Sequence, residues 1–305
     1  MKDSIAVVGV PTALGGQLAD DRHVGMAEAP GDLRGLGFRD QLAEIGLTVR
    51  DLGDVPIQPR VRADADPRLK NREGVAAQLR ATADGVASAA ADGGRVLVLG
   101  GDCCAHAGAL AGLRRARPDR RLAIAWFDAH GDCNTPETTP SGNVWGMPFA
   151  LLLGRGDAAL VAAAEGPTVD LRHAALVGGQ VLDEPESRWL SASPVAHFGA
   201  GMLRTPAGLA ALAGWAEAVA REVDGIYIAV DHDVLDAAEA AWAVTIPETG
   251  GLPADRAADV VRLLAARMPV MGYGATAMNF RVGGDADRTV EAAVRLAAAA
   301  LTELP

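Results

Sequence analysis

The sequence predicts an α/β fold in which helices cover both faces of a mostly parallel sheet. Short apolar runs of strand length alternate with longer segments of helical spacing along almost the whole chain. Half of the 305 residues are apolar but only 4% are aromatic, which predicts a large core of small aliphatic side chains. No linker interrupts the alternation, so we expect one domain over residues 1–305.

The expected strands are short apolar runs, and the first of them is stopped by Pro11. Runs of this length and composition are typical of strands that are buried on both faces of a parallel sheet. In chain order the expected strands span residues 5–10, 47–52, 96–99, 122–127, 174–177, 195–198, 226–230 and 270–273.

Segments with a helical spacing of apolar residues lie between most of these strands. Thr205 and Pro206 predict a helix start, because a capping hydroxyl precedes Pro at the first helical position. The expected helices span residues 33–45, 74–91, 106–115, a segment beginning near Pro148, 205–223, 253–267 and 287–301. The sequence predicts irregular structure elsewhere, namely a loop over 14–31, an exposed excursion over 56–70 and a polar turn around 183–186.

Charge and cysteine content exclude several classes of function. The formal net charge of −11 argues against nucleic acid or an anionic membrane as a partner, and it is compatible with a small cationic substrate. An odd number of cysteines, three in this chain, gives no disulfide framework, so a reducing cytoplasm is the expected location. We find no signal peptide and no apolar run of membrane-spanning length.

Three of the expected strands end in unusual polar residues. Asp102 and Cys103 follow one strand, an Asp-x-His-x-Asp motif over 128–132 follows another, and an Asp-x-Asp motif over 231–233 follows a third. In extended chain the i, i+2, i+4 spacing of the second motif puts its side chains on one face. Because parallel strands bring their carboxyl ends to the same edge of the sheet, we expect the three motifs to converge.

The converging side chains predict a metal centre. The two motifs supply four carboxylates and one imidazole, from Asp128, His130, Asp132, Asp231 and Asp233. Four carboxylates at one edge repel one another unless cations offset their charge, which suggests two metal ions. Oxygen-rich ligands suit Mn²⁺, and two ions would lower the pKa of a water held between them. The alternative is that these residues only cap turns, which would be the better interpretation of a single Asp-x-Asp motif.

The motifs resemble those of the ureohydrolase superfamily, which contains arginase and agmatinase. The resemblance is carried by GGDCC at 100–104, DAHGD at 128–132 and AVDHDVLD at 229–236, with a weaker match in PETGGL at 247–252. It implies a three-layer α/β/α sandwich around an eight-stranded parallel sheet. It also implies two Mn²⁺ ions, hydrolysis of a guanidino group, and assembly into a homo-oligomer.

The same resemblance implies a role for each ligand. Asp128 and Asp231 would bridge both metals, and His130 with Asp233 would complete one site. Asp132 would complete the other and hold the attacking hydroxide. We therefore expect the reaction to depend on Asp132 and His130.

The loop NTPETTPSGN, residues 134–143, resembles the arginase branch in particular. In that branch the loop binds the α-carboxylate of an amino-acid substrate, and a later acidic pair binds the α-amino group. The matching carboxylate-binding positions are Asn134, Thr139, Ser141 and Asn143, and the acidic pair is Asp183 and Glu186. An arginine-like amino acid is therefore expected rather than agmatine, which has no carboxylate.

Three positions depart from the family pattern. Cys103 stands where the family has a metal-ligating His; a thiolate ligand favours Zn, Fe or Co over Mn, and the alternative is an inert buried thiol. Trp145 replaces a proton-shuttling His, and an indole cannot accept a proton in that way; we expect it instead to contact the substrate, by narrowing the pocket or stacking on a planar guanidino group. Ala277 replaces a Glu that pairs with the guanidinium. Two further histidines receive no role: His106 is expected on a helix surface, and His232 is expected to point away from the metals.

These departures favour Nω-hydroxy-L-arginine over arginine as the substrate. An N-hydroxyguanidine is less basic than a guanidine, so a pocket without the Glu costs it less. A subset of arginase-like enzymes from antibiotic pathways, in which Cys replaces the ligand His, cleaves this compound to ornithine and hydroxyurea. The alternatives are an amidinohydrolase for arginine, agmatine or a guanidino acid, and a non-catalytic relative kept for assembly or binding.

Overall fold

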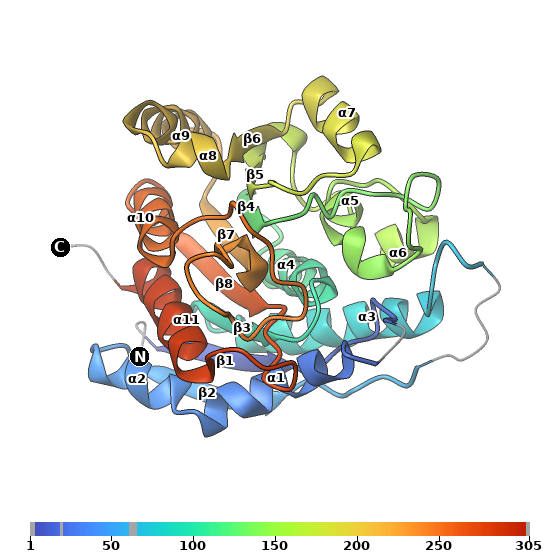
Figure 1. The fold of residues 1–305 in the computed structure, drawn as a ribbon, viewed down its shortest axis with the longest axis horizontal. Helices are drawn as coiled ribbons and strands as arrows, with labels where there is room; N and C mark the ends of the chain where they lie inside the picture. Colours follow the sequence, from blue (N-terminus) through green and yellow to red (C-terminus); the bar gives the residue numbers. More distant parts are fainter. Residues whose placement is uncertain (1–3, 19–20, 61–65, 303–305) are drawn as a thin grey trace.

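The computed structural model describes residues 4–18, 21–60 and 66–302. Eight strands form one sheet, and every neighbouring pair of strands is parallel (Figure 1). Their order across the sheet is β2-β1-β3-β8-β7-β4-β5-β6. The strands are β1 (Ile5–Val10), β2 (Val49–Asp54), β3 (Val96–Gly100), β4 (Leu122–Asp128), β5 (Ala174–Gly178), β6 (Ala196–Gly199), β7 (Gly225–Asp231) and β8 (Val270–Thr276).

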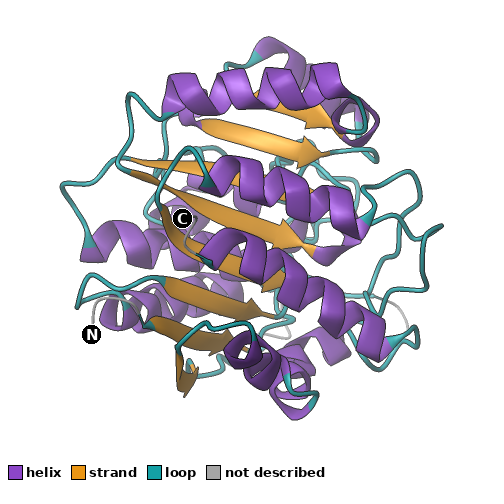
Figure 2. Cartoon of the chain, turned by 90° about the vertical axis from the view of Figure 1, so that its left-hand side faces the viewer, coloured by secondary structure: helices purple, strands orange, loops and turns teal. Residues whose placement is uncertain are grey.

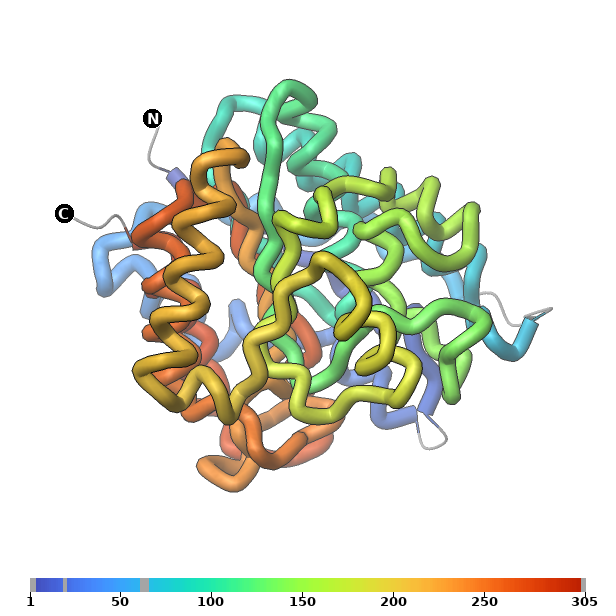
Figure 3. Tube along the Cα trace, turned by 90° about the horizontal axis from the view of Figure 1, so that it is seen from above, coloured from blue at the N-terminus to red at the C-terminus, as the bar shows by residue number. Residues whose placement is uncertain are grey.

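Helices cover both faces of this sheet, which confirms the predicted α/β/α sandwich. One layer holds α1 (Val24–Gly35), α2 (Phe38–Glu44), α8 (Ala200–Leu203), α9 (Pro206–Val219), α10 (Ala254–Ala265) and α11 (Ala286–Leu301). The other layer holds α3 (Arg72–Ala89), α4 (Cys104–Ala116), α5 (Pro148–Leu152), α6 (Ala158–Ala163) and α7 (Glu184–Ala192). Figure 2 shows helices of the first layer in front of the strands. Figure 3 shows α10 and α11, in orange and red, across the molecule from the green α5 and α6.

The sheet separates two hydrophobic cores, and β4 shows how the sequence builds them. All seven of its residues are buried. Ala125 and Phe127 face the core that contains α9, α10 and α11, whereas Ile124 and Trp126 face the core that contains α3 and α4. Because successive side chains of a strand point to opposite faces, burial on both sides produces the continuous apolar runs seen in the sequence.

The prediction was wrong for the chain between β1 and β2. The expected loop over 14–31 contains most of α1, which begins at Val24 and includes Pro30. The single helix expected over 33–45 is instead the end of α1 and a separate α2. Gly37 divides the two helices in a left-handed conformation, with φ +78°, which glycine adopts without the clash of a Cβ.

The polar turn predicted around 183–186 is the start of α7. Asp183 and Glu186 form a capping box, in which each side chain accepts a hydrogen bond from the other residue's backbone N–H. The sequence carries this signal, because Asp and Glu three positions apart flank a Pro at the second helical position. No helix in the described ranges has both the length and the apolar composition needed to cross a membrane.

Candidate metal centre and substrate pocket

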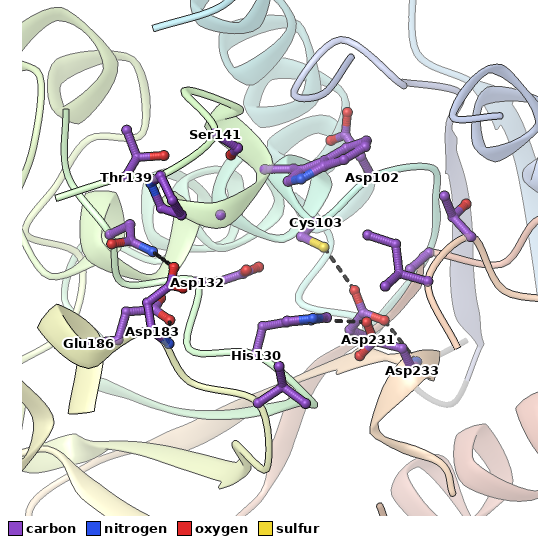
Figure 4. A pocket seen from close by; sticks show the side chains of 18 of the residues that line it. Asp102, Cys103, His130, Asp132, Thr139, Ser141, Asp183, Glu186, Asp231 and Asp233 are labelled. Atoms are coloured by element: carbon purple, nitrogen blue, oxygen red, sulfur yellow. Dashed lines mark hydrogen bonds and ion pairs between the residues drawn. The ribbon is translucent and has the colours of Figure 1, made fainter. Parts of the chain in front are cut away.

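The three predicted motifs meet at the carboxyl edge of the sheet. Cys103 follows β3 and caps α4, Asp128 is the last residue of β4, and Asp231 is the last residue of β7. His130 and Asp233 lie just beyond β4 and β7, and the His130 ring points toward the neighbouring carboxylates of Asp231 and Asp233 (Figure 4). The parallel topology therefore gathers side chains that are more than a hundred positions apart in the sequence.

The potential ligand atoms form two groups that share one carboxylate. One group is Cys103, Asp128 and Asp132; the other is Asp128, His130 and Asp233. Within each group the ligand atoms lie within 4.8 Å of one another. A carboxylate common to two groups of ligands is the arrangement expected of two neighbouring cations.

Short contacts connect these two groups. The Cys103 Sγ donates a hydrogen bond to Asp231 Oδ2 at 2.8 Å. The His130 Nδ1 lies 3.1 Å from Asp233 Oδ2 and 3.3 Å from Asp128 Oδ1. Because Asp231 joins the thiol to the carboxylate cluster, all five predicted oxygen and nitrogen ligands and Cys103 belong to one constellation.

The electrostatics of the carboxylates are those of a cation site. Burial, together with the charge of Asp233, raises the pKa of Asp128 to about 6. Burial also raises the pKa of Asp132 and of Asp231 well above their usual range, and neighbouring carboxylates add to both shifts. The Asp132 Oδ2 atom is buried and has no hydrogen-bond partner. An unpartnered oxygen among crowded carboxylates fits a divalent cation, which would offset both the repulsion and the unmade hydrogen bond.

The Cys103 thiol responds to the same surroundings. Burial raises its pKa well above the usual value, and the carboxylates of Asp231, Asp132 and Asp128 raise it further. A thiol in this position keeps its proton unless a cation lies beside it. Metal ligation by this residue requires the thiolate, so a bound cation would have to reverse the shift.

Asp102 and Asp132 fix the backbone of the site. Asp102 is fully buried, and its carboxylate accepts hydrogen bonds from Gly15 N–H at 2.7 Å and from Cys104 N–H at 3.0 Å. Asp132 adopts a left-handed φ of +48°, which Asp tolerates better than most residues. Its carbonyl accepts hydrogen bonds from Phe149 N–H at 3.0 Å and from Ala150 N–H, so the start of α5 supports the turn.

A cavity of about 170 Å³ opens beside these ligands. Several predicted metal ligands line it: Cys103, His130, Asp132, Asp231 and Asp233. Most of the predicted substrate residues line it as well, namely Asn134, Thr139, Ser141, Trp145, Asp183 and Glu186. The structure therefore brings the two predicted sets of residues to one cavity.

The polar end of the cavity is organised by the 134–143 loop and the start of α7. Asn134 Nδ2 donates to Asp183 Oδ2 at 2.8 Å. Glu186 is buried and accepts hydrogen bonds from Cys133 N–H at 3.1 Å and from Asp183 N–H at 3.0 Å. Asn143 differs from the other predicted residues, because it does not line the cavity and its Oδ1 accepts a hydrogen bond from Gln17 N–H at 3.2 Å.

Another part of the cavity wall is apolar. Trp145, Met26 and Ala277 pack together there and line the cavity. The Trp145 ring packs closely against Gly16, since a Cβ added at Gly16 would be 1.9 Å from the ring. The Trp145 backbone N–H donates to Gly15 O at 2.9 Å, which ties the Trp145 backbone to the Gly15–Gly16 segment.

Two residues near the site were missed by the sequence analysis. His106 does not lie on a helix surface: it is fully buried, with Nδ1 3.0 Å from Tyr227 OH and Nε2 3.0 Å from Thr276 Oγ1. Glu248, in the weakly matching PETGGL segment, has its Oε1 3.6 Å from His130 Nε2. His232 is fully buried and does not line the cavity, as predicted.

Comparisons with known proteins agree with this geometry. The family model described as "Arginase family" matches residues 3–302. The arginase of Bacillus caldovelox is 34% identical over 257 residues, which is 81% of this chain and 81% of the relative. The arginase of Bacillus subtilis is 34% identical over 254 residues, covering 83% and 82% of the two chains. The solved structure of Bacillus caldovelox arginase aligns with a TM-score of 0.88 at 30% identity, covering 100% of this chain and 99% of that one.

Proposed function

Because the chain belongs to the arginase family, whose members hydrolyse amidino groups, we propose that it cleaves Nω-hydroxy-L-arginine to ornithine and hydroxyurea. The membership confirms the predicted ureohydrolase resemblance and makes the chain a hydrolase. The choice among arginine-like substrates depends on the cavity. The observation that carries it is the apolar wall of Trp145, Met26 and Ala277 beside the metal ligands.

This wall favours a weakly basic head group. A guanidinium that enters the cavity loses hydration, and an apolar wall gives it no carboxylate in return. An N-hydroxyguanidine is less basic, so it can enter in its neutral form at a smaller cost. The planar group can also stack on the Trp145 ring, which packs against Gly16.

We propose that two divalent cations complete the site. Asp128 and Asp231 would be shared between them, Cys103 and Asp132 would hold one, and His130 and Asp233 would hold the other. Such ions lower the pKa of water enough to supply a hydroxide nucleophile near neutral pH. Mn²⁺ suits the oxygen-rich ligands, while the Cys103 thiolate would favour Zn, Fe or Co at its own site.

The polar end of the cavity would bind the amino-acid part of the substrate. Asp183 and Glu186 would attract the α-ammonium group, and Asn134, Thr139 and Ser141 would donate hydrogen bonds to the α-carboxylate. Asn143 would act indirectly, because its side chain ties the loop to Gln17. Holding both ends of the substrate fixes the reacting carbon beside the metal ligands.

Asp132 is the proposed proton carrier. The reaction forms a bond between a water oxygen and the guanidino carbon and breaks the bond from that carbon to the ornithine nitrogen. The water loses two protons: the leaving ornithine nitrogen gains one, and the hydroxyimino nitrogen that becomes part of hydroxyurea gains the other. Asp132 lines the cavity and its Oδ2 has no hydrogen-bond partner, so it can accept a proton and return it to the amine.

The test combines metal content with turnover. Protein purified without added metal is analysed for metals per chain by mass spectrometry, then assayed with Nω-hydroxy-L-arginine and arginine. Close to two metals per chain with release of hydroxyurea is the expected result. One metal or none, with no turnover after Mn²⁺ is restored, would overturn the proposal and favour a non-catalytic relative. Turnover of agmatine, guanidinobutyrate or formiminoglutamate instead would keep the enzyme class and replace the substrate.

A further inference from the structure

We propose that Glu248 is a positioning residue whose carboxylate orients the His130 ring, so that Nδ1 is directed at the metal centre. This inference rests on the proposed metal centre and adds a residue to its support. The two ring nitrogens of His130 face different groups. Nδ1 lies 3.1 Å from Asp233 Oδ2 and 3.3 Å from Asp128 Oδ1, whereas Nε2 lies 3.6 Å from Glu248 Oε1.

The position of Glu248 is set by the segment that follows Asp233. The Glu248 carbonyl accepts a hydrogen bond from Ala237 N–H at 2.8 Å. Two residues further on, Gly250 adopts a left-handed φ of +81° and its N–H donates to Asp236 Oδ1 at 3.1 Å. Backbone hydrogen bonds also join Leu252 N–H to Val234 O at 2.8 Å. The loop bearing Glu248 is therefore fastened to the same chain segment as the ligand Asp233.

The imidazole needs such a partner. The side chains of His130 and Glu248 are 29% and 27% exposed, so the core does not lock either of them. An imidazole that ligates a metal through one nitrogen donates its other N–H to a carboxylate or carbonyl, which fixes the tautomer and the ring orientation. The separation of 3.6 Å is an ion-pair distance that is longer than a hydrogen bond.

The position of Glu248 distinguishes this role from substrate binding. Among the described residues, His130 lines the cavity and Glu248 does not. Glu248 is thus placed beside the imidazole without lining the cavity. We expect it to act on the metal through His130, and to have no direct contact with the substrate.

The experiment measures metal affinity in the absence of substrate. Metal-free wild-type protein, Glu248→Gln and Glu217→Gln are titrated with Mn²⁺ by isothermal calorimetry. Glu217→Gln is the control. Glu217 is an exposed residue of α9 that pairs with Arg267, so this change removes the same charge at a place away from the site. Loss of the carboxylate behind a ligating imidazole weakens metal affinity by about 10-fold to 100-fold. We expect that loss for one of the two ions in Glu248→Gln, and none in the control.

Equal affinities for wild type and Glu248→Gln, with the fold of both verified by circular dichroism, would overturn the inference. A raised KM with unchanged metal affinity would also overturn it, because it would place Glu248 in contact with the substrate. The titration contains no substrate, so a wrong substrate assignment cannot alter its result. A wild-type protein that binds no Mn²⁺ would overturn both this inference and the proposed metal centre.

Discussion

His106 should make the stability of this protein sensitive to mildly acidic pH. Its ring is fully buried between Tyr227 of β7 and Thr276 of β8, with 3.0 Å contacts to both hydroxyl groups. Burial lowers the pKa of His106 from 6.5 to about 3. Because α4 begins one residue after Cys103, this contact also fastens the Cys103 backbone to the sheet. Protonation of a buried imidazole opposes the folded state that holds it neutral.

The direction and the size of the effect follow from linkage. The pKa in the folded chain is below the unfolded value, so the unfolded chain binds more protons between pH 6.5 and about 3. The stabilisation is fully present above pH 6.5 and is lost as the pH falls. At about 1.4 kcal/mol per pKa unit, the full shift from 6.5 to about 3 corresponds to about 5 kcal/mol of stability. Between pH 7 and pH 5 the loss is about 2 kcal/mol.

Other buried groups titrate in the same range, so only a difference isolates His106. Burial lowers the pKa of His232 to about 4, which has the same sign. Asp128 has the opposite sign: its pKa is raised to about 6, so it stabilises the folded chain at low pH and loses that effect as the pH rises. These contributions cancel when wild type and a His106 variant are compared in the same buffers.

The assay is urea unfolding of metal-free wild type and His106→Gln at pH 7 and pH 5. His106→Gln should be less stable at pH 7, because it loses packing and hydrogen bonds. When the pH is lowered from 7 to 5, the free energy of unfolding of His106→Gln should fall by about 2 kcal/mol less than that of wild type. His197→Gln is the matched control, since this histidine is exposed and its removal should leave the wild-type pH dependence.

The reasoning would be refuted if the free energy of unfolding fell equally in wild type and in His106→Gln between pH 7 and pH 5. Such a result would mean that the folded chain accepts a proton at His106 without penalty, through water or a rearranged partner. The reasoning would also be refuted if His197→Gln lost less free energy of unfolding than wild type over the same pH interval. The effect would then come from the number of histidines rather than from the burial of His106.

Three further variants test the site. Trp145→His should raise kcat/KM for arginine, because it restores a group that can transfer a proton. An unchanged kcat/KM would mean that the absence of this group is not what limits arginine hydrolysis. Cys103→Ala should lower the metal content, measured by mass spectrometry, from near two ions per chain to near one. An unchanged metal content would exclude the thiol as a ligand. Gly16→Ala would put a Cβ 1.9 Å from the Trp145 ring and should cost about 1–3 kcal/mol of stability by calorimetry. Gly35→Ala, whose Cβ would meet nothing within 4 Å, is its control and should show no such loss.

Most of the strands were predictable because they are buried on both faces, although the edge strands β2 and β6 are partly exposed. An apolar run such as β4 needs no knowledge of its neighbours to be recognised, and all eight expected runs are strands of the described sheet. The chain between β1 and β2 was not predictable in the same way. Pro30 inside α1 and Gly37 before α2 are usual signs of irregular structure, and here tertiary packing on the sheet overrides them.

The metal ligands were predictable from the topology of the sheet, whereas the residues that contact and hold them, such as Glu248 and His106, were not. Parallel strands must bring Asp128 and Asp231 to one edge, whatever the order of the strands between them. The contact of Glu248 with His130 depends on how a loop folds back. The burial of His106 depends on which face of α4 meets the sheet. Neither is encoded in a local spacing.

The three positions that depart from the family pattern line one cavity. Ala277 and Trp145 belong to one apolar cluster with Met26, and Trp145 rests on Gly15 and Gly16. Beneath Trp145, a Cβ at Gly15 would lie 2.7 Å from the Cys104 sulfur, directly beside Cys103. Asp102 binds this same glycine and also the start of α4. A change at one of these positions therefore alters the packing of the others, and residues in such contact do not act additively. The thiol, the indole and the missing carboxylate are best understood as one altered wall of the cavity.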